Sequence, residues 1–183
     1  MIMSPGSRKL ALTVHIGVSV GWLGAVAAYL ALDISVATNQ DAQALRSGYL
    51  AMAAIAGNVI VPLAVAALLT GLVMSLGTRW GLVRHYWVVI SLVSTIIAVA
   101  VLLIEVQTID RLARVAADPA TSDADLRGLG STLAHSVGGT MVLLIILTLN
   151  MVKPRGMTRY GWRKERRQRA QQAETAHTLK GST

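Results

Sequence analysis

The sequence predicts an all-α integral membrane protein, a four-helix up-down bundle. Its composition is that of a membrane protein: 54% of the residues are hydrophobic and only 14% are charged, against about 25% charged in soluble domains. In addition, four apolar runs are each long enough to cross a hydrocarbon core of about 30 Å as a helix. The expected spans are residues 10–32, 50–76, 87–104 and 131–152.

The first span combines an uncharged apolar run with a polar face. Polar and aromatic residues recur in it at spacings of three, four and seven, which places them on one side of a helix. The residues of this face are His15, Ser19, Trp22, Tyr29 and Asp33. Gly17 and Gly21 form a small-xxx-small pair that lets a second helix approach closely. A histidine in the polar face of a spanning helix indicates a functional role.

The second span contains Asn58 and Pro62. Proline removes the backbone bond to residue i−4, so a kink is predicted near Asn58, whose amide can hydrogen-bond across helices. Thr38 or Asn39 is expected to cap this helix. Residues 77–86 then form a short connection, and basic and aromatic residues gather there as in a membrane-interface belt. They are Arg79, Trp80, Arg84, His85, Tyr86 and Trp87.

The longest loop is expected at residues 106–130. Apolar residues at helical spacing predict that its first half continues the third helix or lies along the membrane surface. Asp118 and Pro119 should break that helix. Ser122 followed by Asp125 resembles a helix start with an acidic third position.

Residues 1–152 are predicted to form the membrane domain and residues 153–183 a basic tail, disordered over about its last dozen residues. The tail should contact anionic lipid headgroups. Nucleic acid is excluded as a partner, since no recognised nucleic-acid-binding fold accompanies the net charge of +8. Of the 17 Lys and Arg residues, 13 fall on the side of the two termini. The positive-inside rule therefore predicts cytoplasmic termini.

A first candidate site lies at the cytoplasmic end of the bundle and comprises His15, Trp22, Arg84 and His85. Neutral imidazole binds haem iron or copper, and arginine can pair with haem propionates at the water boundary. The site is thus predicted to bind haem or copper. Alternatively, His15 hydrogen-bonds a neighbouring helix and His85 is an interfacial side chain.

A second candidate site lies at the outer end of the bundle and comprises His135, Glu105 and Asp33. One imidazole and two carboxylates can bind a divalent metal or relay protons. Alternatively, the acids at the helix ends face water and His135 is bonded locally. His15 and His135 should differ in depth by about 20 Å, so one metal ion cannot bind both.

The cysteine content and the absence of known catalytic motifs limit the kinds of site that the sequence predicts. The chain has no cysteine, which excludes disulfides, iron–sulfur clusters and thiolate metal sites. No catalytic triad, phosphate loop or metalloprotease motif is present, so no catalytic residue is predicted. The glycines of the spans serve helix packing or make room for a flat cofactor. They are Gly17, Gly21, Gly24, Gly138 and Gly139.

Four segments resemble a family of uncharacterised bacterial four-helix membrane proteins. They are VHIGVSVGWLGA (14–25), TGLVMSLGTRWGLVRHYWVV (70–89), LAHSVGG (133–139) and KPRGMTRYGWRK (153–164). The resemblance covers the chain up to about residue 165. It implies a multi-pass protein of the bacterial cytoplasmic membrane, and the family has no settled activity to transfer.

The H-x6-WLG arrangement is more loosely similar to CopD-type copper-resistance proteins and to the haem-binding membrane protoporphyrinogen oxidase. This similarity implies that His15 is a haem ligand. Ser91 stands where those patterns often have lysine, and Glu105 where they often have histidine. Two functions are therefore expected: a haem- or copper-associated redox protein using His15, or a non-enzymatic partner subunit, scaffold or homo-oligomer that packs through its glycine faces.

Overall fold

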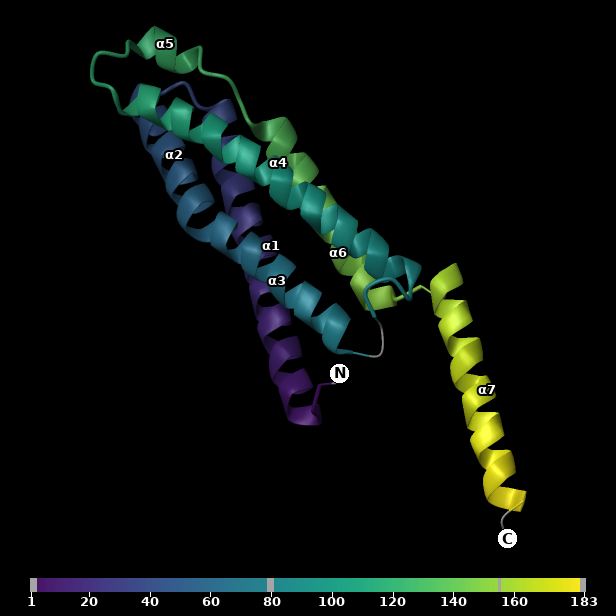
Figure 1. Ribbon diagram of the computed structural model, residues 1–183. Helices are drawn as coiled ribbons and strands as arrows, with labels where there is room; N and C mark the ends of the chain where they lie inside the picture. Colours follow the sequence, from purple (N-terminus) through teal and green to yellow (C-terminus); the bar gives the residue numbers. More distant parts are fainter. Residues whose placement is uncertain (1–2, 79–80, 155, 182–183) are drawn as a thin grey trace.

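The computed structural model describes residues 3–78, 81–154 and 156–181, which contain helices and no strand. The four helical segments long and apolar enough to cross a membrane are Pro5–Thr38, Ala42–Gly77, Tyr86–Ala117 and Leu133–Val152 (Figure 1). The predicted all-α bundle of four membrane-spanning helices is thereby confirmed. Arg79, Trp80, Arg155 and the last two residues of the predicted tail lie outside the described residues.

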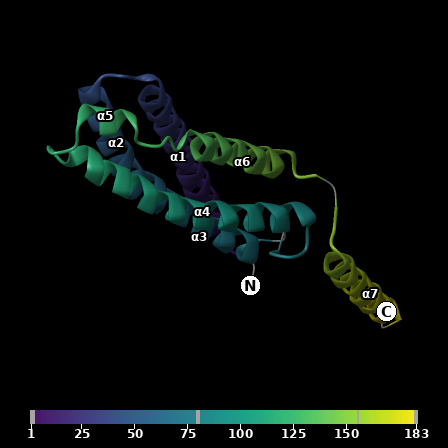
Figure 2. The ribbon, with the colours of Figure 1, turned by 90° about the horizontal axis from the view of Figure 1, so that it is seen from above.

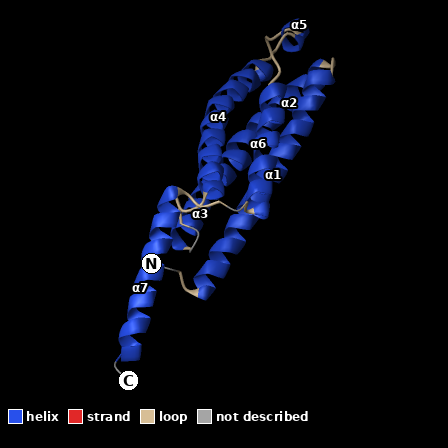
Figure 3. Cartoon of the chain, turned by 90° about the vertical axis from the view of Figure 1, so that its right-hand side faces the viewer, coloured by secondary structure: helices blue, strands red, loops and turns tan. Residues whose placement is uncertain are grey.

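Each span packs beside the next one in the chain, and the fourth packs beside the first. Helix α1 (Pro5–Thr38) contacts α2 (Ala42–Ile55), α3 (Val61–Gly77) and α6 (Leu133–Val152). Helix α4 (Tyr86–Ala117) contacts α2, α3 and α6 from the other side (Figures 1 and 2). The loops gather at two ends (Figure 3). We name them the loop end, with residues 39–41 and 118–132, and the tail end, with the described residues 78, 81–85, 153–154 and 156–158.

The second span departs from α-helical geometry where the sequence predicts a kink. Between α2 and α3, a π-helical turn, η1 (Ala56–Ile60), has the N–H of Val61 donating to the carbonyl of Ala56. Pro62 follows at once and supplies no N–H. The amide of Asn58 donates to the Ala54 carbonyl of its own helix at 3.0 Å. The Asn58 amide thus bonds within its own helix, whereas the sequence suggested a bond to another helix.

The start of the second span differs from the prediction. Asp41 caps α2, because its carboxylate accepts the Ala44 N–H at 2.8 Å. Thr38 belongs to α1, which runs several residues past the predicted end of the first span. Asn39 instead accepts the N–H of Asp41 at 2.9 Å and shapes the turn. The cap predicted at Thr38 or Asn39 was wrong, since an acidic residue two positions later fits the first turn.

Helix α4 continues well into the predicted long loop, as the apolar spacing indicates. Ile109, Ala113 and Ala116 are buried, and α4 packs against α2. The helix ends at Ala117, immediately before Asp118 and Pro119. Ser122 then caps the short helix α5 (Asp123–Arg127) by accepting the N–H of Asp125, as predicted.

Two clusters of buried side chains hold the bundle together. One lies at the loop end around Met52, Ile109 and Leu126. The other lies deeper, around Trp22 and Leu143. Many large apolar side chains point outward instead. A bilayer solvates such side chains, so an outward apolar surface is what four spanning helices require.

The basic tail forms a further helix, α7 (Arg159–Gly181), which extends beyond the tail end of the bundle (Figures 1 and 3). The N–H of Thr158 donates to the Arg84 carbonyl at 3.0 Å, and the N–H of Tyr86 donates to the Gly156 carbonyl at 3.4 Å. Glu165 lies 3.9 Å from the Arg84 guanidinium. The first turns of α7 are thus attached to residues 83–86, and the disorder expected over the last dozen residues of the tail stays a prediction.

Candidate functional site

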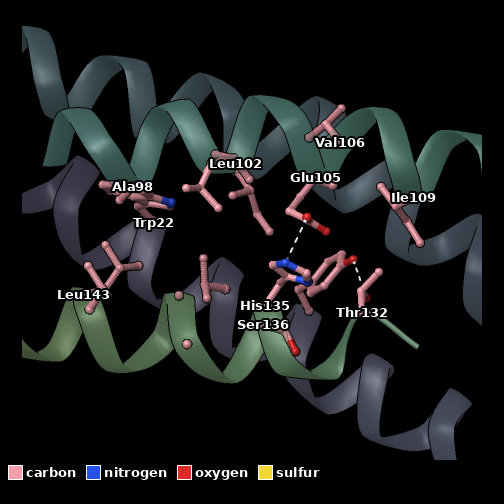
Figure 4. A pocket seen from close by; sticks show the side chains of 18 of the residues that line it. Trp22, Ala98, Leu102, Glu105, Val106, Ile109, Thr132, His135, Ser136 and Leu143 are labelled. Atoms are coloured by element: carbon pink, nitrogen blue, oxygen red, sulfur yellow. Dashed lines mark hydrogen bonds and ion pairs between the residues drawn. The ribbon is translucent and has the colours of Figure 1, made fainter. Parts of the chain in front are cut away.

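A pocket opens between α4 and α6 in the loop-end half of the bundle (Figure 4). Its free volume is about 270 Å³, near the lower limit of the ~300–1,000 Å³ typical of small-molecule sites. Ile97, Val101 and Val142 border it and are exposed. The pocket therefore opens sideways, toward the surface that faces lipid.

The pocket walls are mostly apolar. Trp22 and Val26 of α1, Leu102 of α4 and Leu143 of α6 contribute large side chains, and η1 contributes Ala56 and Ile60. Gly138 and Gly139 line the pocket on α6, and a Cβ added at either would meet nothing within 4 Å. The missing side chains of these two glycines therefore leave part of the room in the pocket.

One end of the pocket is polar. The Nε2 atom of His135 lies 3.3 Å from Oε1 of Glu105, and the two side chains are 57% and 21% exposed. Figure 4 shows them facing each other across the pocket, from α6 and α4. Tyr29 of α1 also lines the pocket, and its hydroxyl is 3.1 Å from Oγ1 of Thr132. The polar end thus joins three of the four spans.

A buried carboxyl group lies behind this polar end. Asp33 is only 1% exposed. Its Oδ2 atom accepts hydrogen bonds from Thr132 Oγ1 at 2.9 Å and from Ser136 Oγ at 2.7 Å. Since Thr132 gives its one proton to Asp33, the Tyr29 hydroxyl is the donor in its bond to Thr132. A directed chain of hydrogen bonds therefore runs from Tyr29 to Asp33.

Two buried polar atoms of this region have no hydrogen-bond partner in the described part of the chain: Nε1 of Trp22 and Oδ1 of Asp33. Trp22 is 5% exposed and lines the pocket. A buried donor left unpaired costs about 1–3 kcal/mol. The Nε1 atom of Trp22 is itself buried, so the rest of the ring provides the contribution of Trp22 to the pocket surface.

The structure brings two of the three predicted metal ligands together. Glu105 and His135 form a pair, whereas Asp33 is engaged by Thr132 and Ser136. Across the described residues, no group of three or more His, Asp or Glu side chains is placed to hold a metal ion. The geometry of this end favours hydrogen bonding and proton transfer over metal coordination.

The residues predicted for a haem or copper site lie in separate places. His15 Nδ1 is 2.9 Å from Oγ1 of Thr70 on α3, and Thr70 gives its own proton to the Ala66 carbonyl. His15 therefore donates from Nδ1, which leaves the lone pair on Nε2. Trp22 lines the pocket, while Arg84 contacts Glu165 at the start of α7.

His85 lies at the tail end as well. It pairs through its backbone with Met157, and its ring centroid is 6.4 Å from that of Trp87. Trp87 is itself buried, which departs from the predicted interface belt. Arg84 and His85 thus help to attach α7. His15 forms the hydrogen bond to a neighbouring helix that the sequence analysis gave as the alternative to a ligand role.

Sequence reasoning missed Thr132 and Ser136 as site residues. They are four apart at the start of α6 and share one helix face, which is the signal that the sequence contains. Hydroxyl groups near the end of a span are common, however, and nothing local connects them to a carboxyl 99 or 103 residues earlier. Only the packing of α1 against α6 shows the connection.

No protein-family model, no curated protein and no solved structure matches this chain. The resemblance to uncharacterised bacterial membrane proteins, and the looser similarity to copper-resistance and haem-binding proteins, therefore stay predictions.

Proposed function

We propose that this integral membrane protein binds an amphipathic molecule of the bilayer in the pocket between α4 and α6. The observation that carries the proposal is the apolar pocket itself, which opens toward lipid and ends at the polar side chains of Glu105 and His135. The walls suit a ring or a section of a chain, and the polar end suits a hydroxyl or carbonyl head. Such a molecule can arrive through lipid without crossing water.

Labelling with a photoactivatable long-chain alcohol tests this proposal. The protein is reconstituted in vesicles, irradiated with the diazirine-bearing alcohol and digested, and the labelled peptides are identified by mass spectrometry. We expect labels on α4 and α6 within residues 97–109 and 133–143.

A matched pair of glycine variants separates pocket binding from general lipid contact. Gly138→Leu fills the pocket and should lower labelling at least tenfold. Gly24→Leu is the control, because Gly24 also has open space around its Cβ position and does not line the pocket. Labels spread evenly over the lipid-facing sides of all four spans, unchanged in Gly138→Leu, would contradict the proposal.

A second candidate function is haem b or copper binding at His15. The favouring observation is the Nε2 lone pair left by the bond to Thr70, since neutral imidazole ligates through such a nitrogen. The purified protein should then show a Soret band or bound copper that His15→Ala removes while the bundle stays folded. A colourless, metal-free preparation that also fails to label would instead support the partner-subunit, scaffold or homo-oligomer alternative.

The orientation and the lipid partner of the tail are proposed on charge. The tail end gathers most of the Lys and Arg residues, so we place it in the cytoplasm of a bacterial cell, with α7 near anionic headgroups. Reporter fusions within residues 118–130 should then report the outer side. Vesicle binding by the full chain should rise with anionic lipid content and fall with salt.

A further inference from the structure

We infer that water from the loop end reaches the polar end of the pocket through a second cavity and the Asp33 cluster, here Asp33, Thr132 and Ser136. The molecule in the pocket then has its apolar part in the bilayer and its head in contact with water. This inference rests on the proposed function and deepens it, because it assigns a hydrated head group, such as a hydroxyl or carbonyl, to the ligand.

The second cavity lies at the loop end between the α1–α2 turn and residues 126–131. Its free volume is about 130 Å³, room for several waters at roughly 30 Å³ each. Asn39, Gln40 and Arg127 give it a polar lining toward the outside. Tyr49 and Ser131 line it as well. Such a cavity has the size and the polar partners that bound water needs.

The Asp33 cluster separates the two cavities. Val36 and Ala37, one turn after Asp33 on α1, line the second cavity. Ser131 lines the second cavity and its neighbour Thr132 lines the pocket. The hydrogen bond from Thr132 to Asp33 therefore lies between the loop-end cavity and the pocket.

The unpaired oxygen of Asp33 is the observation that points to water. Both hydroxyls of the cluster donate to Oδ2, and Oδ1 has no partner in the described part of the chain. Nor does any described Lys, Arg or His form an ion pair with Asp33. Buried carboxyl oxygens without a protein partner are satisfied by water.

Single cysteines test the route directly, since the native chain has none. Ser136→Cys places a thiol in the cluster. Ser91→Cys is the matched control, because Ser91 and Ser136 are both 7% exposed, and Ser91 faces Asn150 near the tail end. Both variants are reconstituted in vesicles. They are treated on both faces with 2-(trimethylammonio)ethyl methanethiosulfonate, a charged reagent that does not cross lipid. We expect Ser136→Cys to react at least tenfold faster.

A third variant tests the path itself. Ser131→Trp, made in the Ser136→Cys protein, fills the loop-end cavity and should slow the reaction about tenfold. Equal rates for Ser136→Cys and Ser91→Cys, in proteins that elute as folded monodisperse species, would overturn the inference. A reaction rate that Ser131→Trp leaves unchanged would also overturn the inference, since the reagent would then reach Ser136→Cys by another path.

The thiol rates are measured without any ligand, so they are independent of the photolabelling result. Failure of photolabelling with fast Ser136→Cys modification would refute the proposed ligand and leave the water route intact. If the photolabelling and the thiol rates both give the expected results, the photoactivatable alcohol should slow the reaction of Ser136→Cys with the reagent several-fold. Absence of protection would show that the head group does not lie at the Asp33 cluster.

Discussion

Replacing Arg46 should destabilise the turn that follows α4 at the loop end of the bundle. Its guanidinium donates to three backbone carbonyls, those of Ala116 at 2.7 Å, Asp118 at 2.8 Å and Thr121 at 2.6 Å. These carbonyls lie where α4 ends and the chain turns toward α5. Arg46 on α2 therefore holds together three successive parts of that turn, and arginine alone offers enough donors in one plane to do so.

The expected loss follows from these three bonds. A hydrogen bond involving a charged group contributes about 1.5–3 kcal/mol when buried. Here the acceptors lie close to water, which replaces part of each bond in the variant, and bonds sharing one side chain do not add fully. We therefore expect Arg46→Ala to lower the free energy of unfolding by about 2–3 kcal/mol. Arg46→Lys should lose about half as much, since one ammonium cannot reach all three carbonyls.

Reversible unfolding in mixed micelles, followed by circular dichroism against the fraction of dodecyl sulfate, measures this loss. Arg114→Ala is the matched control, because Arg114 is an exposed arginine on the last turns of α4. Its removal should change stability by less than about 0.5 kcal/mol. Proteolysis within residues 117–131 should also accelerate in Arg46→Ala only. Equal stabilities of Arg46→Ala and Arg114→Ala would refute the reasoning.

Three further substitutions have definite outcomes. Gly48→Ala should lower the free energy of unfolding by about 1–3 kcal/mol, since its Cβ would collide with the buried side chain of Val36; a denaturation midpoint equal to that of the native protein would contradict this contact. Gly161→Ala should free α7 from residues 83–86, because its Cβ would meet the Arg84 carbonyl, and should speed tryptic cleavage before α7 at least tenfold; Gly156→Ala, with only an ordinary contact, should not. His15→Ala should cost only about 0.6 kcal/mol if His15 serves packing alone, and an unfolding loss above about 2 kcal/mol would show a larger structural role.

The parts of the fold that depend on a few neighbouring residues could be predicted from the sequence. The apolar runs gave the four spans, and Asp118 with Pro119 gave the end of α4. Ser122 and Asp125 gave the start of α5, because a cap acts within one helical turn. The cap of α2 was missed by two residues, since several capping residues follow one another there and only the turn geometry selects Asp41.

The site depended on contacts that no local pattern contains. Depth along the helices indicated that Glu105 and His135 lie at the same end, and the structure places them 3.3 Å apart. Depth cannot show which way each side chain points around its helix, so the engagement of Asp33 by two hydroxyls was missed. Arg46 was missed for another reason: its partners are backbone carbonyls, which every residue possesses.

The π-helical turn η1 has a mechanical consequence for the whole second span. The N–H of Val61 bonds to Ala56, one carbonyl beyond its α-helical partner, so the helix contains one additional residue at this turn. Moving that residue into the α-helical register rotates α3 about its axis by roughly 100° per residue relative to α2. Ala56 and Ile60 line the pocket, and Thr70 on α3 holds His15. A substitution that removed the π-helical turn would therefore change both the pocket wall that η1 supplies and the position of the Thr70 hydroxyl that holds the His15 imidazole.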